Sequence, residues 1–198
     1  MTTILNRSVY RDLATQVTET RNPVSYESAI EMTGNDILWR HDVDSSIQAA
    51  LDIANIDAEM GLSATFFVNL RSDTYNLQSN YGRHFLSSIL ELGHHIGVHL
   101  DSEYYGHFST PKELEKCLSE EAVTFEEMVG KRPTSFSFHN PSPRELTFDA
   151  IRYAEMINCY SQHLRNTCEY ISDSNGFWRN SSICLLYTSD AADDTPCV

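Results

Sequence analysis

The chain has 198 residues, of which 41% are hydrophobic, so it is long enough for one domain with a sizeable core and too apolar for a disordered chain. Its 28 acidic and 14 basic residues give a net charge of −14, which argues against binding of nucleic acids or anionic membranes and leaves neutral partners such as carbohydrates open. No run reaches the ~20 apolar residues of a membrane span and the N-terminus lacks the apolar stretch of a signal peptide, so we expect no membrane insertion and a cytoplasmic location.

Residues 1–35 are polar and mixed in character, and we interpret them as an N-terminal lead-in segment. Within it the pattern predicts a short helix around Val9–Val17 and a turn at Asn22-Pro23. The regular pattern begins after this segment, and we place the domain proper at 36–183.

From residue 37 onward, strand and helix patterns alternate. Runs of β-branched and aromatic residues predict strands, and apolar residues at helical spacing between a capping Ser or Thr and a Gly predict helices. In chain order these are a strand at 37–42, a helix at 45–60, a strand at 64–68, a helix through 85–92, a strand at 95–100, a helix at 111–129, a strand at 135–138, a helix at 143–154, and strands at 157–160 and 169–172. This order implies parallel strands with helical crossovers, in an open α/β sheet or a (β/α) barrel.

The last segment, 184–198, looks like the translation of an adapter used in sequencing libraries, read in frame after a broken gene. Such a segment is excluded from fold reasoning. We therefore expect an α/β fold that is incomplete at its C-terminus. The five cysteines show no CxxC spacing, so neither a zinc knuckle nor a disulfide framework is predicted.

Two carboxylates, Asp42 and Asp44, end the first predicted strand. Residues i and i+2 of a strand share a face, so both side chains project together from its C-terminal end. Carboxylates this close repel one another unless a cation, a proton or hydrogen-bond donors lie between them. The pair therefore predicts a metal ligand beside a general base. His41 lies on the opposite face, where we expect it to pack or to form an ion pair.

Further metal-competent or catalytic side chains follow the other predicted strands. They are His99 and Glu103 after the third strand, His139 and Asn140 after the fourth, and Asp173 after the last. In both candidate architectures the chemistry gathers at the C-terminal ends of the strands. The sequence thus predicts one site at this edge.

The pair His95 and His99 has the spacing of a metal motif only on a helix. On a strand, four residues span roughly 13 Å, which is too far for one ion to bind both, so we choose His99, at the exit of the strand. His139 is the first choice for the remaining ligand, and Glu103 is the alternative. Two imidazoles and one carboxylate suit Zn²⁺ or another borderline divalent metal and leave a coordination position open for water.

At these residues the chain resembles the polysaccharide deacetylase family (NodB homology, carbohydrate esterase family 4-like), whose members are metal-dependent and have a distorted (β/α)7 barrel. The segments that resemble its first motif, its second strand and its approach to the first metal histidine are 40–44, 64–68 and 93–99. The resemblance implies that Asp42 is the base and that Asp44 and His99 bind the metal.

The match is looser further along. The family has a second histidine four residues after the first, where this chain has Glu103. The segment 131–141 is similar to the third motif and offers His139 in place of the missing ligand. The resemblance implies that the end of this motif, at Asn140-Pro141, forms a wall of the substrate groove. Tyr104 is an aromatic candidate for a second wall.

The segment 173–179 resembles the fourth motif of the family. The resemblance implies that Asp173 orients the base and that Trp178 and Arg179 line the substrate pocket. The last motif of the family, which supplies a histidine as general acid, does not occur after Arg179.

The resemblance implies hydrolysis of an N- or O-acetyl group on an amino sugar or polysaccharide, by a C-terminally truncated (β/α)7-type barrel with a divalent metal, Zn²⁺ in the first instance. Two alternatives remain open at this point. One is a catalytically inactive sugar-binding barrel, and the other is a related amidase that acts on a small substrate with a C–N bond.

Overall fold

The computed structural model describes residues 7–172 and shows a mixed α/β fold. The helices are α1 Arg7–Thr20, α2 Ile47–Glu59, α3 Asn80–Glu91, α4 Pro111–Val129 and α5 Gln162–Thr167, with short 3-10 helices η1 Tyr26–Ser28 and η2 Glu145–Thr147. The strands are β1 Asn22–Pro23, β2 Asp36–Ile37, β3 Arg40–Val43, β4 Thr65–Val68, β5 His95–Asp101, β6 Ser135–His139, β7 Arg152–Tyr153 and β8 Met156–Asn158.

Six strands form one sheet in the order β3-β4-β5-β6-β8-β7. The first five of these are parallel, and β7 pairs antiparallel with β8 at the edge. The alternation of strands and helices is confirmed from β3 to β6. The carboxyl ends of these four parallel strands lie at the same edge of the sheet.

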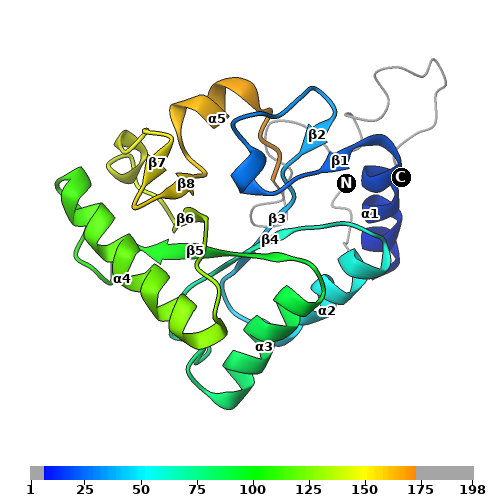
Figure 1. Cartoon of the computed structure of the whole chain (residues 1–198), viewed down its shortest axis with the longest axis horizontal. Coiled ribbons are helices and arrows are strands. Elements are labelled where there is room, and N and C mark those ends of the chain that lie inside the picture. Colours follow the sequence, from blue (N-terminus) through cyan, green and yellow to red (C-terminus); the bar gives the residue numbers. More distant parts are fainter. Residues whose placement is uncertain (1–6, 173–198) are drawn as a thin grey trace.

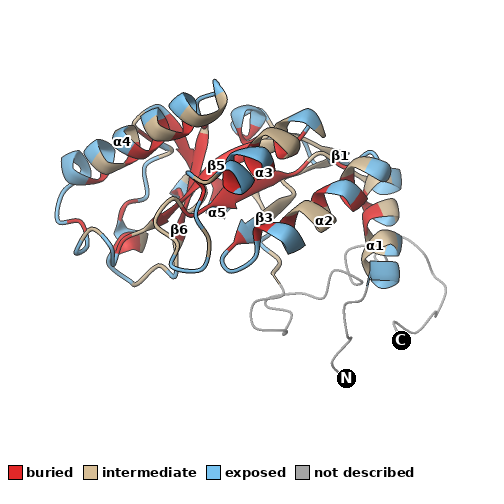
Figure 2. Cartoon of the chain, turned by 90° about the horizontal axis from the view of Figure 1, so that it is seen from below, coloured by how far each residue is buried: buried red, intermediate tan, exposed pale blue. Residues whose placement is uncertain are grey.

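One face of the sheet is covered by α2, α3 and α4, which follow one another along it (Figure 1). Buried aromatic and aliphatic side chains fill this interface, and Figure 2 shows the buried strands between helices whose outward faces are exposed. The core residues contributed by the strands include Phe66, Val68, Val98, Leu100, Phe136 and Phe138. Alternation along each strand sends the intervening residues to the opposite face.

Helices α2, α3 and α4 lie where the sequence predicts them. Side chains of Ser46, Ser79 and Thr110 accept hydrogen bonds from the first-turn backbone N–H groups of α2, α3 and α4. Gly130 ends α4 with φ of 72°, a left-handed conformation that favours glycine. These caps fix the lengths of the crossovers and therefore the register of the strands that follow.

The opposite face of the sheet has little room above its centre. Phe67 on β4 packs against the edge of the Tyr26 ring, with 5.4 Å between ring centroids. The neighbouring residue on β5 is Gly97, where an added Cβ would lie 2.4 Å from Cε1 of Phe67. Glycine is therefore required at this position so that the aromatic ring can lie across the strand.

Arg40 crosses the same face. Its guanidinium lies 4.6 Å above the Phe67 ring and donates through Nη2 to Oγ of Ser137 at 2.6 Å. Arg40 is on β3 and Ser137 is on β6, with two strands between them, which is about 14 Å at the usual spacing of a flat sheet. The contact shows that the sheet curls toward this face.

The lead-in segment packs on the domain. The predicted helix is present as α1, whose Ala14 and Val17 are fully buried in a cluster with Leu62. The turn expected at Asn22-Pro23 is instead the short strand β1, which pairs with β2. None of the helices between residues 7 and 172 combines the length and apolar character needed to span a membrane.

The helix predicted at 143–154 is wrong. The chain forms only η2 there and then the hairpin of β7 and β8, whose turn residues Ala154 and Glu155 have positive φ angles of 49° and 65°. The buried side chain of Asn158 holds the preceding loop by donating to the carbonyl of Phe148 at 2.7 Å. Tertiary packing thus overrides the helical pattern.

The end of the described chain also differs from the prediction. A short helix, α5, follows β8 and begins at Ser161, whose side chain caps it. The predicted strand at 169–172 is reduced to an isolated bridge at Ser172. Asp173, Trp178, Arg179 and the segment 184–198 lie outside the described residues.

Replacement of Gly97 by Ala tests the crowding above the sheet. We expect Gly97→Ala to lower the free energy of unfolding by about 1–3 kcal/mol, because the new methyl group must displace the Phe67 ring. Urea denaturation measures the change. Gly34→Ala is the control, since no atom lies within 4 Å of an added Cβ there. Equal effects of the two substitutions would contradict this account.

Candidate metal centre

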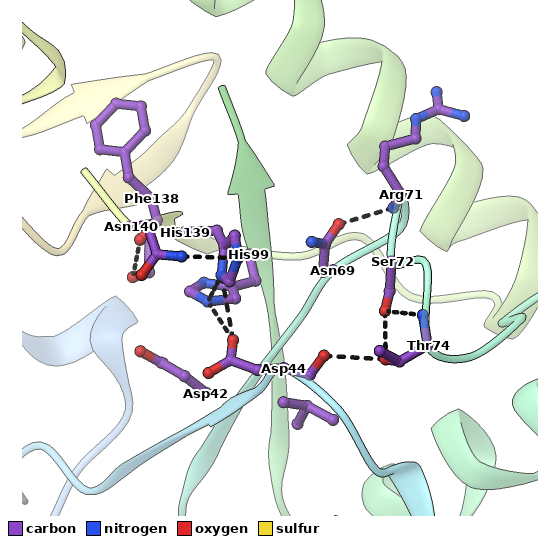
Figure 3. Close-up of polar contacts among 12 residues, drawn as sticks. Asp42, Asp44, Asn69, Arg71, Ser72, Thr74, His99, Phe138, His139 and Asn140 are labelled. Carbon is purple, nitrogen blue, oxygen red and sulfur yellow. Dashed lines mark hydrogen bonds and ion pairs between the residues drawn. The ribbon is translucent and has the colours of Figure 1, made fainter. Parts of the chain in front are cut away.

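Three side chains meet at the carboxyl edge of the sheet: Asp44 directly after β3, His99 near the end of β5 and His139 at the end of β6. Nε2 of His99 lies 3.1 Å from Oδ1 of Asp44, and Nδ1 of His139 lies 3.2 Å from the same oxygen. The two ring nitrogens are 3.3 Å apart. Figure 3 shows the three groups facing one another.

These distances fit ligands of a single ion. Bonds of ~2.0–2.1 Å in a tetrahedral arrangement separate neighbouring ligand atoms by about 3.3–3.4 Å. The donor set of two imidazoles and one carboxylate suits Zn²⁺ or a similar divalent metal. The side chain of His99 is 3% exposed, whereas that of Asp44 is 55% exposed, so the centre is accessible from the Asp44 side. The residues therefore fit a divalent metal with an open coordination position.

The charge of Asp44 is favoured by its neighbours. The hydrogen bond with His99 lowers the pKa of Asp44 below its ordinary value, although partial burial opposes the shift. The electrostatic attraction of His99 and of His139 acts in the same direction as the hydrogen bond. These contacts favour the charged form of the carboxylate.

The main chain at Asp44 is held by the loop after β4. Oγ1 of Thr74 donates to the carbonyl of Asp44 at 3.0 Å, and the hydroxyl of Tyr75 donates to the carbonyl of Val43 at 2.5 Å. The hydroxyl of Tyr75 in turn accepts from the backbone N–H of Asn69 at 3.0 Å. Sequence reasoning missed these residues, because a loop without periodicity gives no signal of contacts to backbone carbonyls.

Figure 3 shows Asp42 next to Asp44 at the candidate centre. The carboxylate of Asp42 is paired with a cation of the protein, Arg40. Nη2 of Arg40 donates to both carboxylate oxygens of Asp42, at 2.6 and 2.7 Å. Burial acts to lower the pKa of Arg40, but Asp42 together with the smaller effects of Tyr26, Cys159 and Tyr160 outweighs it, and the pKa lies above the ordinary value. Arg40 was also missed, although its position two residues before Asp42 places both on one strand face.

The structure distinguishes the two candidates for the third ligand. His139 is part of the cluster, whereas Glu103 is an exposed turn residue after β5 that is not in it. The backbone N–H of Glu103 donates to the carboxylate of Asp101 at 3.0 Å. His95, at the start of β5, is likewise not in the cluster.

Two predicted groove residues have defined positions. The amide of Asn140 lies 3.1 Å from Nε2 of His139 and so orients that ring. A metal bound through Nδ1 of His139 would leave the ring proton on Nε2. Rotation of the Asn140 amide group by half a turn would then place its oxygen as the acceptor of this N–H. Tyr104 is 59% exposed, with the guanidinium of Arg71 4.9 Å from the centre of its ring.

His41 has the expected structural role. Its Nε2 lies 2.8 Å from a carboxylate oxygen of the buried Asp57, which also accepts from the hydroxyl of Tyr10 at 2.6 Å. This cluster connects α1, α2 and β3 on the face opposite Asp42. His41 is therefore a packing and ion-pair residue.

A buried acid on α4, Glu121, lies against Tyr105, the residue after Tyr104. Glu121 on α4 is fully buried, and its Oε1 accepts from the hydroxyl of Tyr105 at 2.8 Å, with Nε of Arg71 at 3.7 Å. Its Oε2 is buried and has no hydrogen-bond partner among the described residues. Burial raises the pKa of Glu121 to about 7, against the opposing effects of Tyr105 and Arg71.

No protein-family model matches the chain, and no curated protein is significantly similar to it.

The ligand assignment predicts which side chains the affinity for Zn²⁺ depends on. Loss of an outer-shell partner of a metal ligand weakens metal binding by roughly 10–100-fold. We expect a larger loss of Zn²⁺ affinity in Asp44→Ala and in His139→Ala, because each substitution removes a ligand atom. Glu103→Ala should leave the affinity unchanged. Isothermal titration calorimetry measures these values, and an equal affinity of the wild type and Asp44→Ala would refute the assignment.

The loop contacts predict a weaker effect of the same kind. Tyr75→Phe removes the hydrogen bond to the carbonyl before Asp44, so we expect roughly 10-fold weaker binding of Zn²⁺. Tyr81→Phe is the matched control, because its hydroxyl donates to Gln48 on α2. A similar loss in both variants would show that the effect is not specific to the loop.

The raised pKa of Glu121 predicts a pH-dependent stability. At a pH below 4.5, the ordinary pKa of a glutamate, the contribution of the protonated acid to the stability of the folded state is fully present. This contribution is lost as the pH rises through about 7, the pKa of Glu121 in the folded state. Glu121→Gln should therefore gain stability relative to the wild type between pH 5 and pH 8 in urea denaturation. Glu120→Gln, at an exposed neighbour, is the control. A difference that does not change with pH would contradict the shift.

Proposed function

We propose that this chain is a metal-dependent hydrolase that removes an acetyl group from an amino sugar or polysaccharide, on a barrel of the polysaccharide deacetylase type. The observation that carries the proposal is the convergence of Asp44, His99 and His139 beside Asp42. The resemblance of segments 40–44 and 93–99 to the motifs of that family supports the same reading.

Each group has a defined task in this proposal. A divalent metal, when bound, polarises the acetyl carbonyl and lowers the pKa of the attacking water. Asp42 takes the proton of that water as general base. Arg40 fixes the orientation of the Asp42 carboxylate, and Arg40 is itself held by Ser137. Asn140 orients the ring of His139.

The geometry favours this function over the two alternatives. A sugar-binding barrel without chemistry has no need of three ligand atoms within 4.8 Å of one another. An amidase for a small metabolite needs a closed, cationic pocket. Here Asp44 is open to solvent, and the nearby cation Arg40 is neutralised by Asp42. An open edge with the exposed Tyr104 suits a carbohydrate chain.

Acetate release from N-acetylated and O-acetylated oligosaccharides by the Zn²⁺-loaded full chain tests the proposal. We expect release by the wild type, and a loss of about 10²–10⁴-fold in Asp42→Asn with unchanged affinity for Zn²⁺, since the base is removed and the ligands remain. Hydrolysis of small amides alone would favour the amidase. Sugar binding without any hydrolysis would favour the inactive barrel.

A further inference from the structure

The side-chain amide of a largely buried residue, Asn69, lies beside the candidate metal ligands. The parallel pairing of β4 with β5 ends where Val68 lies opposite Val98. The residues that follow these two, Asn69 and His99, therefore lie side by side, on the face of the sheet that Arg40 crosses. Asn69 is 5% exposed. Figure 3 shows its side chain between Arg71 and His99, with the amide nitrogen on the side of His99.

The orientation of this amide is fixed by its other end. Oδ1 of Asn69 accepts from the backbone N–H of Arg71 at 2.8 Å. Rotation of the amide by half a turn would place its NH₂ group against that N–H, with two donors facing one another. The NH₂ group is therefore directed away from Arg71 and toward the metal ligands.

The position of Asn69 is coupled to the ligand loop. Its backbone N–H donates to Tyr75, whose hydroxyl donates to the carbonyl of Val43 directly before Asp44. The donor and the ligand Asp44 are thus held in one hydrogen-bonded frame.

The NH₂ group of Asn69 donates to none of the described residues. Among these residues the buried side-chain atoms that lack a partner are Nδ1 of His99 and Oε2 of Glu121, so the Asn69 nitrogen is accessible to solvent at the edge of the centre. Nδ1 of His99, which has no hydrogen-bond partner within residues 7–172, does not serve as the acceptor. When Nε2 of His99 binds a metal, the ring proton resides on Nδ1 and this atom becomes a donor. The Asn69 donor is therefore open to an acceptor that enters the centre from solvent.

We propose that Asn69 is a substrate-orienting residue whose NH₂ group donates to the oxygen of an acetyl or carboxylate ligand at the open position of the metal centre. The inference rests on the proposed function, which supplies the acetyl group. The carbonyl oxygen is then polarised from two sides, by the metal and by a fixed amide dipole. Side-chain donors of this kind contribute about 10²–10³-fold to acyl-transfer rates. The donor selects ligands with an acceptor oxygen over isosteric ligands without one.

Acetate binding to the Zn²⁺-loaded full chain tests the inference without any turnover. Asn69→Ser shortens the side chain, so that the hydroxyl still accepts from the N–H of Arg71 but does not reach the centre. Asn69→Asp keeps the shape and replaces the donor by an acceptor. We expect at least 10-fold weaker binding of acetate in both variants by calorimetry, with the affinity of Asn69→Ser for Zn²⁺ within threefold of the wild type.

The matched controls are Asn55→Ser and Asn55→Asp on the exposed face of α2, where the Asn55 amide donates to the carbonyl of Leu51. Acetate affinity should be unchanged in both. Thermal unfolding confirms that each variant is folded, and the Asp variant remains a test if the Ser variant is not.

Unchanged acetate affinity in the folded Asn69 variants would overturn the inference, and so would a wild type that binds Zn²⁺ but no acetate. Loss of Zn²⁺ together with acetate would also overturn it, since Asn69 would then only support the ligands. Weaker acetate binding in a protein that releases no acetate from any sugar would uphold the role of Asn69 and refute the proposed function. Deacetylation at normal rates in the Asn69 variants would uphold the proposed function and refute the role of Asn69.

Discussion

The parallel register of β3 to β6 is the constraint on which the site depends. Because these strands run in one direction, the residues that leave their carboxyl ends meet at one edge. Asp44, His99 and His139 are far apart in sequence, and this edge brings one atom of each within hydrogen-bond distance of the others. Helices α2, α3 and α4 pack on the face of the sheet away from Arg40 and hold the strands in this register.

The curl of the sheet is the second requirement. Arg40 reaches from β3 to Ser137 on β6 because no bulky side chain stands between them. The strands between them contribute the ring of Phe67, over which the guanidinium passes, and Gly97, which has no side chain. This crossing aligns Asp42 without any residue from a loop. The ligand Asp44, by contrast, lies beyond the end of β3 and requires the loop contacts of Thr74 and Tyr75. Asp42 and Asp44, the proposed base and the proposed ligand, are thus held by different parts of the structure.

The sequence is informative where local pattern and tertiary position agree. Runs of β-branched and aromatic residues and helix caps predict β3 to β6 and α2 to α4. The tendency of chemistry to gather at the carboxyl ends of parallel strands then leads to Asp44, His99 and His139. The helix expected at 143–154 fails because Asn158 and the β7–β8 hairpin bind this segment through contacts that no local period encodes. Arg40, Asn69 and Tyr75 are found only in three dimensions, since they act through neighbours on other strands or through backbone atoms.

X-ray absorption spectroscopy at the zinc edge of the loaded full chain tests the central claim most directly, because it reports the ligand atoms of the ion. The account predicts nitrogen and oxygen ligands at ~2.0–2.1 Å with the outer-shell pattern of two imidazoles, reduced to one in His139→Ala. Sulfur ligands at ~2.3 Å would contradict it, since they would place the ion on cysteines instead of Asp44, His99 and His139. A spectrum of His139→Ala identical to that of the wild type would contradict it equally.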